Sequence, residues 1–376
     1  MSGIYIHIPF CKQACHYCDF HFSTNLKLKD QLVTAIGKEL ALQNEYLGKK
    51  TLIETIYFGG GTPSLLTEKD LGFIFETIYK YFDIASNPEI TLEANPDDLT
   101  SEKLNTLKSF PVNRFSIGIQ SFYEPHLLYL NRAHTAIEAR ECVQKTQDAG
   151  FNNISIDLIY AIPYPDHSVW EKDLETTLQL NIQHISAYCL TIEQQTAFGK
   201  WLRTGKIKAA DEEFSTYQFI KLIETLKENG FEQYEISNFA LPDYQARHNS
   251  NYWRKQPYLG IGPSAHSFNS LTRQFNVANN LKYIKAIEKN QVPSTLETLS
   301  INDQVNEYIM TSLRTKWGCN LKEIKVWSGL DIQQMNQSYL TDCLKRNLLT
   351  LDHEILRLTD SGKLVADQIA SDLFVV

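Results

Sequence analysis

Residues 5–22 read YIHIPFCKQACHYCDFHF and carry three cysteines on one short segment. The three are Cys11, Cys15 and Cys18. A β-prone run over residues 5–9 precedes them, so the sequence predicts a strand that leads directly into the cysteine loop. Three thiolates on one loop can bind a single metal centre, and a 4Fe–4S cube held by three cysteines instead of the usual four keeps one iron open. The alternative is a zinc site completed by His16 or His21, because structural zinc takes four ligands.

The composition excludes several classes of protein. The chain has 376 residues, 43% hydrophobic and 21% charged, which is enough for a full-size globular core and a second module. Its net charge of −8 disfavours non-specific binding to nucleic acid. The seven cysteines are odd in number, which favours a reducing compartment over a disulfide scaffold. Four of them lie outside the loop and are expected to be buried thiols: Cys142, Cys189, Cys319 and Cys343.

The N-terminus has no basic segment followed by an apolar run, and no stretch of the chain approaches 18 uninterrupted apolar residues. We therefore expect neither a signal peptide nor a membrane span, and a cytoplasmic location.

The order of predicted elements indicates a parallel α/β fold. Strands are predicted over residues 5–9, 53–58, 90–93, 114–120, 154–160 and 185–192. Helical patterns separate them over residues 30–47, 68–81, 138–149 and 169–180, and Thr100 caps a further short helix. Such alternation implies parallel strands joined by right-handed crossovers. Six strand–helix units are too few for a closed eight-fold barrel and suit an open (β/α)6 partial barrel.

Several polar and glycine positions fall at or near the carboxyl ends of these strands. They are the cysteine loop, Gly59–Gly61, Glu93, Gln120 and Asp157. In parallel α/β proteins the chemistry gathers at these ends. We therefore expect these residues to face one cavity.

The remaining chain divides into two parts. The sequence predicts a helix over 211–229 and a strand over 231–236. Two segments follow, RHNSNYWR (247–254) and YLGIGPSAH (258–266), and we predict that they form a structured loop and not a helix. From about Ser300 the pattern predicts three helices, a hairpin turning near Asp352 and a final helix, a winged-helix-like arrangement. Residues 301–376 contain eight Lys and Arg against ten Asp and Glu. This balance favours a lid or docking module over a nucleic-acid reader.

The predicted organisation has three parts. It consists of a (β/α)6 core over 1–235 with its cysteine loop at 10–24, a connecting segment over 236–300, and a mostly helical, winged-helix-like domain over 301–376.

The cysteine spacing, with Tyr17 directly before the third cysteine, resembles the radical S-adenosylmethionine (SAM) superfamily. The resemblance implies a 4Fe–4S cluster on the three cysteines, whose open iron is chelated by the amino and carboxylate groups of SAM. GGGTP at 59–63 resembles the glycine-rich SAM-binding segment of that superfamily. The residues that the resemblance assigns to the cofactor site are Tyr5, Tyr17, Gly60, Gly61, Thr62, Glu93, Gln120, Arg132 and Asp157.

Six segments resemble the coproporphyrinogen-dehydrogenase-like subgroup over nearly the whole chain: YIHIPFC, GGGTPS, LEANPDDL, FSIGIQSF, LNRAH and IDLIYAIP. That subgroup contains oxygen-independent coproporphyrinogen III dehydrogenases and haem chaperones of the HemW type. Three features favour the second kind. Phe20 stands where the dehydrogenases have a fourth cysteine, the long N-terminal extension of the dehydrogenases has no counterpart before Tyr5, and an HNxxYW motif occupies residues 248–253.

The resemblance therefore implies a protein that binds a 4Fe–4S cluster, SAM and haem and passes haem to acceptor proteins. His248 is the expected haem ligand, with Tyr252 and Trp253 stacking on the macrocycle, and His266 is a further candidate. A one-electron reductant such as flavodoxin or ferredoxin, transient membrane association and no nucleic acid complete the expected partners. The alternative is a radical decarboxylase, the oxygen-independent coproporphyrinogen III dehydrogenase. A nucleic-acid-binding regulator is a weaker third possibility.

Overall fold

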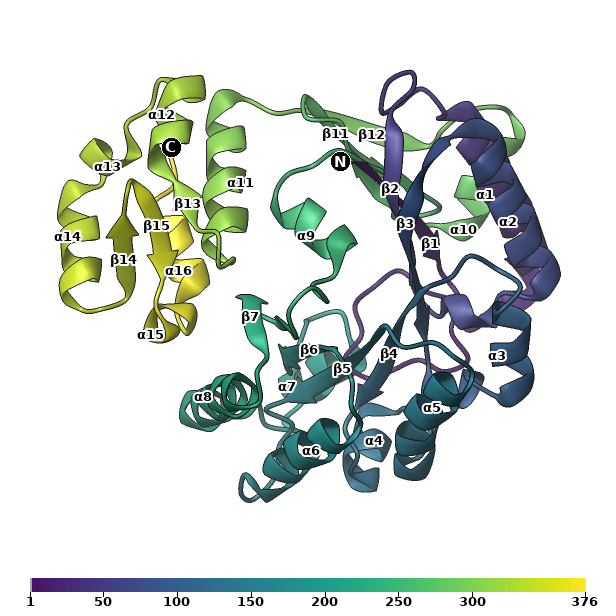
Figure 1. Cartoon of the computed structure of the whole chain (residues 1–376), viewed down its shortest axis with the longest axis horizontal. Coiled ribbons are helices and arrows are strands. Elements are labelled where there is room, and N and C mark those ends of the chain that lie inside the picture. The colour runs from purple at the N-terminus through teal and green to yellow at the C-terminus, as the bar shows by residue number, and fades with distance from the viewer. Residues whose placement is uncertain (1) are drawn as a thin grey trace.

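The computed structural model describes residues 2–376 and is built around an open parallel barrel (Figure 1). The six barrel strands are β1 (Ser2–Ile8), β2 (Leu52–Gly60), β3 (Asp83–Ala94), β4 (Arg114–Gln120), β5 (Ile154–Tyr160) and β6 (His184–Cys189). Each pairs in parallel with the next in sequence order. The outer edges of β1 and β6 pair with other strands and not with each other, so the barrel stays open. The predicted (β/α)6 core is confirmed.

The helices that alternate with these strands cover the outside of the barrel (Figure 1). They are α1 (Lys29–Leu42), α2 (Glu68–Tyr81), α3 (Ser101–Leu107), α4 (Glu124–Leu130), α5 (Ala136–Asp148), α6 (Ser168–Gln179), α7 (Ala197–Arg203) and α8 (Glu212–Glu228). Short 3-10 turns occur at Leu26–Leu28, Pro63–Leu65 and Pro96–Asp98. Helix α2 has the predicted bounds, because Thr67 and Asp70 form a capping box at its start. Helices α4 and α7 were not anticipated.

Alternate residues of the barrel strands face opposite sides, as the two-residue period of a strand requires. On β1, Ile4, Ile6 and Ile8 are buried in the apolar core shared with α1 and α2. The residues between them belong to a polar interior, where the rings of Tyr5 and Tyr57 stack with centroids 6.0 Å apart. The barrel therefore has an apolar outer layer and a polar lumen that can hold functional groups.

Residues 236–300, predicted as a connecting segment that carries the HNxxYW motif, also supply strands on both sides of the barrel sheet. Strand β8 (Asn238–Ala240) pairs antiparallel with β6, and β7 (Glu232–Glu235), which lies just before this segment, pairs antiparallel with β8. On the other edge β9 (Tyr258–Ile261) runs parallel to β1 and continues into β10 (His266–Phe268), β11 (Thr272–Asn276) and β12 (Ser294–Thr298). The result is a single twelve-stranded sheet, and α10 (Asn280–Glu288) lies against α1.

Helix α9 (Arg247–Trp253) corrects the prediction of a loop over residues 247–254. The glycine and proline residues that suggested a loop all lie beyond residue 256. The first turn of α9 is stabilised from another part of the chain, because the Glu89 carboxylate of β3 accepts the backbone N–H groups of Arg247 and His248, each at 2.9 Å. This carboxylate replaces the local cap that sequence patterns detect.

A buried carboxylate holds the sheet extension against α1. Glu39 of α1 accepts hydrogen bonds from the Gly262 N–H at 2.8 Å, Asn276 Nδ2 at 2.7 Å and the Tyr283 hydroxyl at 2.5 Å. Gln43 donates to the same carboxylate at 2.8 Å. Burial raises the pKa of Glu39, and these four donors supply the partners that a buried carboxylate needs. The network fixes the loop at Gly262 that leads into β10 and His266.

The C-terminal domain has its own apolar core, which includes Val305, Ile309, Leu340 and Leu356. It comprises α11 (Ile301–Leu313), β13 (Cys319–Asn320), α12 (Leu321–Ser328), α13 (Ile332–Met335), α14 (Gln337–Lys345), β14 (Leu349–Asp352), β15 (Ile355–Leu358), α15 (Asp360–Lys363) and α16 (Ala366–Asp372). The hairpin turns at His353 and Glu354, close to the predicted position. The third helix predicted for this domain is divided into α13 and α14, and the predicted final helix into α15 and α16. Helix α11 faces the barrel side of the molecule (Figure 1).

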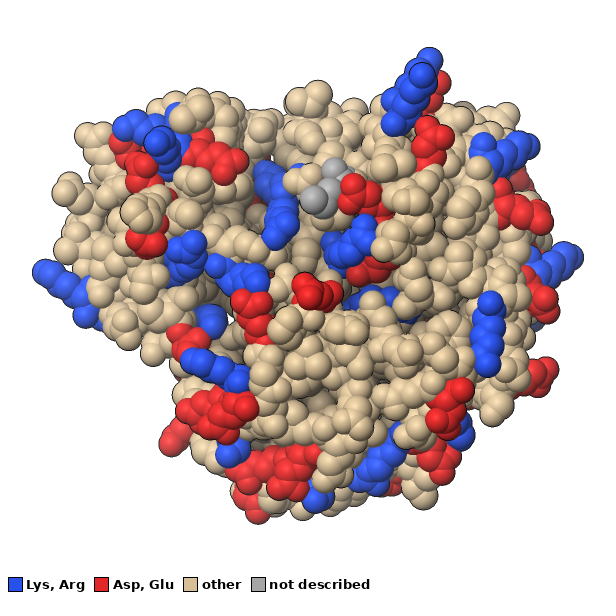
Figure 2. All heavy atoms as spheres, in the orientation of Figure 1, with Lys and Arg blue, Asp and Glu red and all other residues tan. Residues whose placement is uncertain are grey.

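Charged side chains of both signs are interspersed on the face shown in Figure 2. Within residues 2–376, every helix is too short or too polar to cross a lipid bilayer.

Candidate cofactor and ligand site

The cysteine loop leaves β1 and is anchored by backbone hydrogen bonds at both ends. The Ser23 N–H donates to the Pro9 carbonyl at 2.8 Å, and the Cys11 N–H donates to the Ser23 carbonyl at 3.1 Å. The three predicted metal ligands line one cavity of about 470 Å³: Cys11, Cys15 and Cys18. All three are free thiols, and burial raises the pKa values of Cys11 and Cys18, the latter to about 12.

The two histidines of the zinc alternative are engaged outside this cavity. His16 Nδ1 lies 2.9 Å from the Tyr129 carbonyl, and the ring packs edge-on against Trp201. His21 Nε2 lies 2.7 Å from Asn280 Oδ1. The positions of His16 and His21 do not support a zinc site completed by either residue.

The cavity of the cysteines also contains most residues assigned to the cofactor. They are Tyr17, Gly60, Gly61, Thr62, Glu93, Gln120, Arg132 and Asp157. Cys189 lines the same cavity and is exposed, which corrects its predicted burial, whereas Cys142, Cys319 and Cys343 are buried. Tyr5, His248 and His266 lie on an adjoining cavity. The sequence-predicted residues thus divide between two neighbouring cavities at the barrel interior.

The glycine segment packs directly on the backbone of the cysteine loop. The Gly61 N–H donates to the Ile8 carbonyl at 2.9 Å, and the Thr62 N–H donates to the Phe10 carbonyl at 2.7 Å. A Cβ at Gly61 would lie 2.7 Å from the Phe10 carbonyl oxygen, too close for any side chain. Gly60 has a φ of +103°, and a Cβ there would lie 2.5 Å from the His7 ring. Glycine is therefore required for this close approach.

Two partly buried carboxylates face the cavity. Glu93 accepts hydrogen bonds from the Tyr57 hydroxyl at 2.8 Å and the Gly60 N–H at 3.2 Å, and burial raises its pKa to about 7. Asp157 accepts a hydrogen bond from the Ser116 hydroxyl at 3.2 Å, and burial raises its pKa to about 6. Such groups can accept hydrogen bonds from hydroxyls or an amine of a bound molecule.

Arg132 joins the cysteine loop to the polar interior. Its Nη2 donates to Asn95 Oδ1 at 2.6 Å and to the Gly118 carbonyl at 2.9 Å, while its Nη1 lies 3.2 Å from Cys15 Sγ. Its Nε is buried without a hydrogen-bond partner. The free thiols, this fixed cation, the glycine segment and the carboxylates fit a three-cysteine cluster with SAM beside it.

Glu93 should give the iron-free protein a pH-dependent stability. Its pKa rises from an ordinary 4.5 to about 7 on folding, so between these values the folded state holds a proton that the unfolded state has lost. The free energy of unfolding then falls as the pH rises from 4.5 to 7, by up to about 3 kcal/mol. We expect urea unfolding to show a larger loss of stability between pH 5 and pH 8 in the wild type than in Glu93→Gln. Equal losses in both proteins would contradict this assignment.

The second cavity, of about 870 Å³, adjoins the first and contains His248. Gly60, Glu93 and Phe20 line both cavities. His248 Nδ1 lies 2.9 Å from the Thr55 hydroxyl, and its ring packs on Tyr57 with centroids 5.1 Å apart. Burial lowers the pKa of His248 to about 4, so the imidazole is neutral at physiological pH. When Nδ1 donates to Thr55, the Nε2 lone pair is free for a metal.

Flat aromatic and further basic groups complete the second cavity. Tyr252 and Trp253 of α9 line it together with Tyr258 of β9, as does the exposed His266, whose ring stacks on Phe275 at 5.5 Å. Arg273 of β11 lies on the same wall. A cavity of this size with aromatic walls and a few polar groups suits a large, flat organic ligand.

Sequence reasoning missed Thr55 and Tyr57, which hold His248 and Glu93. Their signal is the two-residue period of β2, which places them with Gly59 on the lumen side. It missed Arg273 because β11 is joined to the barrel through β10 and β9, and β9 pairs with β1 from far away in the sequence.

Comparison with known proteins agrees with this geometry. The profile of the Radical SAM superfamily matches residues 5–175, and that of the HemN C-terminal domain matches residues 299–365. The heme chaperone HemW of Lactococcus lactis is 32% identical over 96% of this chain and 94% of its own length. HemW of Bacillus subtilis is 32% identical over 98% of both chains, and HemW of Escherichia coli is 30% identical over 98% of this chain and 96% of its own.

The fold is shared with a solved enzyme structure. Coproporphyrinogen III oxidase (HemN) from Escherichia coli, a radical SAM enzyme, superposes with a TM-score of 0.86 at 20% identity, covering 100% of this chain and 90% of that one. The cysteine loop, the glycine segment and the full-length likeness to HemW proteins lead to one assignment. The chain belongs to the radical SAM superfamily and, within it, to the family of the heme chaperones HemW.

Proposed function

We propose that this protein binds haem in the second cavity and delivers it to acceptor proteins, with a 4Fe–4S cluster and SAM in the first. The observation that carries the proposal is the neutral, half-buried His248 on an aromatic-walled cavity of about 870 Å³ that opens onto the cysteine cavity. A neutral imidazole is a common axial ligand of haem iron, and the macrocycle needs flat apolar surface beside it. His266, on the same wall, is a second candidate ligand.

In the first cavity, Cys11, Cys15 and Cys18 would hold the cluster, which supplies single-electron chemistry to SAM when both are bound. The protein residues bind SAM and fix its orientation. Arg132 offers a fixed cation to a carboxylate, and the partly buried carboxylates Glu93 and Asp157 offer acceptors. Gln120, Thr62 and the ring of Tyr17 complete the wall, and Tyr5 supports Tyr57 from β1.

A second candidate function is the oxygen-independent coproporphyrinogen III dehydrogenase, favoured by the shared fold of the E. coli HemN structure. Phe20 argues against it, because its exposed ring lies where both cavities meet, at the position of the fourth cysteine of the dehydrogenase pattern. We therefore favour haem delivery over coproporphyrinogen III dehydrogenation as the function of this protein.

The proposed partners follow from this function. They are haem, haem-accepting proteins and a one-electron reductant such as flavodoxin or ferredoxin, with transient membrane association during delivery. A cytoplasmic location fits a protein that needs free cluster cysteines. We propose no nucleic-acid partner, in keeping with the net charge of −8 and the mixed charges of Figure 2.

His248→Ala should weaken haem binding by about tenfold or more, because the iron loses a nitrogen ligand, a loss of about 1.4 kcal/mol per tenfold. Titration with ferric haem, followed by its Soret band, measures the effect. His353→Ala, at the exposed tip of the β14–β15 hairpin, is the matched control and should bind as the wild type does. The visible spectrum of the cluster should be unchanged in both variants. If His248→Ala binds haem as tightly as the wild type does, His248 is not a ligand of haem.

A further inference from the structure

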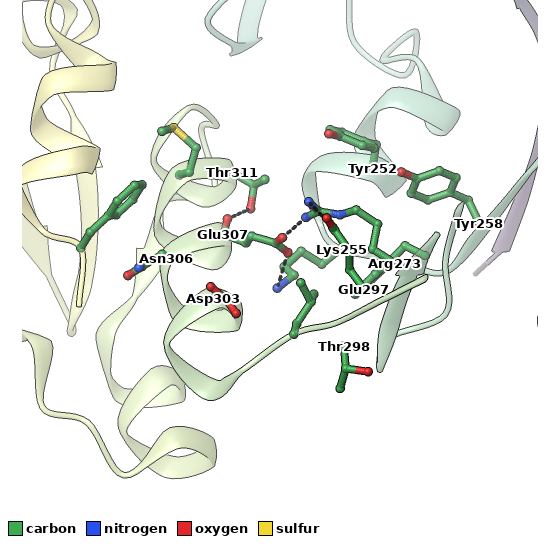
Figure 3. Close-up of a pocket in the computed structure, with 14 residues that line it drawn as sticks. Tyr252, Lys255, Tyr258, Arg273, Glu297, Thr298, Asp303, Asn306, Glu307 and Thr311 are labelled. Atoms are coloured by element: carbon green, nitrogen blue, oxygen red, sulfur yellow. Dashed lines mark hydrogen bonds and ion pairs between the residues drawn. The ribbon is translucent and has the colours of Figure 1, made fainter. Parts of the chain in front are cut away.

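A third cavity, of about 780 Å³, lies between the edge of the sheet and α11 of the C-terminal domain (Figure 3). Three residues line both this cavity and the second cavity, where we place haem: Tyr252, Tyr258 and Arg273. The rings of Tyr252 and Tyr258 lie with centroids 5.8 Å apart. The proposed haem site therefore extends towards the domain junction, with Arg273 at the boundary.

Two cations meet one carboxylate in this junction (Figure 3). Glu307 of α11 forms an ion pair with the Arg273 guanidinium, and its other oxygen lies 3.5 Å from Lys255 Nζ. The side chains of Arg273, Lys255 and Glu307 are only 34%, 20% and 23% exposed, so water screens the cluster less than it screens a surface pair. Lys255 also donates to the Gln304 carbonyl at 3.2 Å, and Glu297 lies 3.9 Å from Arg273.

The two sides of this ion cluster belong to different domains. Arg273 and Lys255 lie on the sheet side, beside the aromatic wall, whereas Glu307 reaches across from α11. A guanidinium presents paired N–H groups that match a carboxylate, and a neighbouring ammonium adds a second charge. A propionate of a tetrapyrrole bound in the second cavity could therefore replace the Glu307 carboxylate between these two cations.

We propose that Arg273 and Lys255 are the carboxylate-binding residues for the propionates of bound haem, and that Glu307 competes with those propionates for the two cations. This inference rests on the proposed function, and it names the part of the ligand that the domain junction recognises. When a haem propionate replaces the Glu307 carboxylate, Arg273 and Lys255 still face one negative charge. The propionate and Glu307 therefore compete through ion pairs of similar strength. Removal of Arg273 and removal of Glu307 should therefore change haem affinity in opposite directions.

The test compares ferric haem with its dimethyl ester, which has the same ring and iron but no free carboxylates, using the full-length protein. Arg273→Gln should weaken haem binding by about tenfold or more and leave ester binding unchanged. Glu307→Gln should strengthen haem binding by about threefold or more, again without effect on the ester. Arg346→Gln, which removes an exposed arginine paired with Asp342 at 3.3 Å, is the matched control. Circular dichroism and thermal unfolding check that each variant is folded.

Each outcome decides the question. Opposite effects of Arg273→Gln and Glu307→Gln on haem alone support the inference. Equal effects on haem and its ester, or no gain in Glu307→Gln, overturn it while leaving the proposed function intact. Failure of the wild type to bind either ligand overturns both.

Discussion

Alanine in place of Cys11, Cys15 or Cys18 is expected to abolish the 4Fe–4S cluster in each of the three variants. The three thiols lie on one anchored loop and line one cavity, so loss of any one leaves the cluster with two protein ligands. Anaerobic reconstitution followed by iron analysis should give about four irons per wild-type chain and close to none per variant. The electron paramagnetic resonance signal of the reduced cluster should disappear with the iron.

Cys189→Ala provides the sharpest control for this result. Cys189 lines the same cavity and is exposed, whereas Cys142 and Cys343 are buried elsewhere. Cys189→Ala and Cys142→Ala should both keep the full cluster. Loss of the cluster in Cys189→Ala, or a retained cluster in Cys15→Ala, would show that the ligand set is different.

Gly60→Val is expected to weaken SAM binding by about tenfold to a hundredfold. Its Cβ would lie 2.5 Å from the His7 ring, which is held by the His21 carbonyl at 3.0 Å and by the Tyr5 hydroxyl at 3.2 Å. Because His7 cannot move freely, the glycine segment must shift, and overpacking of this kind costs about 1–3 kcal/mol. The shift also moves the Gly60 N–H away from Glu93.

Gly150→Val separates this effect from general backbone strain. Gly150 also has a positive φ, +95°, but a Cβ there would meet no atom within 4 Å. Both valine variants should lose stability through the left-handed backbone, and only Gly60→Val should lose SAM. Isothermal titration with SAM on the reconstituted protein measures this. Equal SAM affinity in the two variants would place the cofactor away from the glycine segment.

The sequence predicts the barrel well because its strands and helix starts are local features. Strands β4 and β5 have the predicted bounds of 114–120 and 154–160, and β5 is almost wholly apolar. The three cysteines, the glycine segment, Glu93 and Asp157 share a cavity because parallel strands present their carboxyl ends on one side.

Elements that depend on distant partners escaped prediction. Helix α9 is capped by Glu89, far away in sequence, and the edge strands β9 to β12 are short segments that pair only in the folded sheet. The Arg273 and Glu307 pair joins β11 of the extended sheet to α11 of the C-terminal domain. No periodicity or spacing within either segment indicates such contacts.

We expect this protein to bind haem without converting coproporphyrinogen III. Radical decarboxylation requires each reacting propionate carbon to lie within a few ångströms of the attacking radical, and small misplacements cost large factors in rate. The Phe20 side chain lies between the two cavities, at the position where the dehydrogenase pattern has its fourth cysteine.

The most direct measurement is an anaerobic incubation of the reconstituted protein with coproporphyrinogen III, SAM and a reductant, with E. coli coproporphyrinogen III oxidase as the positive control. Chromatography of the oxidised porphyrins reports conversion, and a parallel titration reports haem binding. We predict saturable haem binding and no protoporphyrinogen IX above the no-enzyme background. Steady formation of protoporphyrinogen IX over several turnovers would contradict the account and identify the protein as a dehydrogenase.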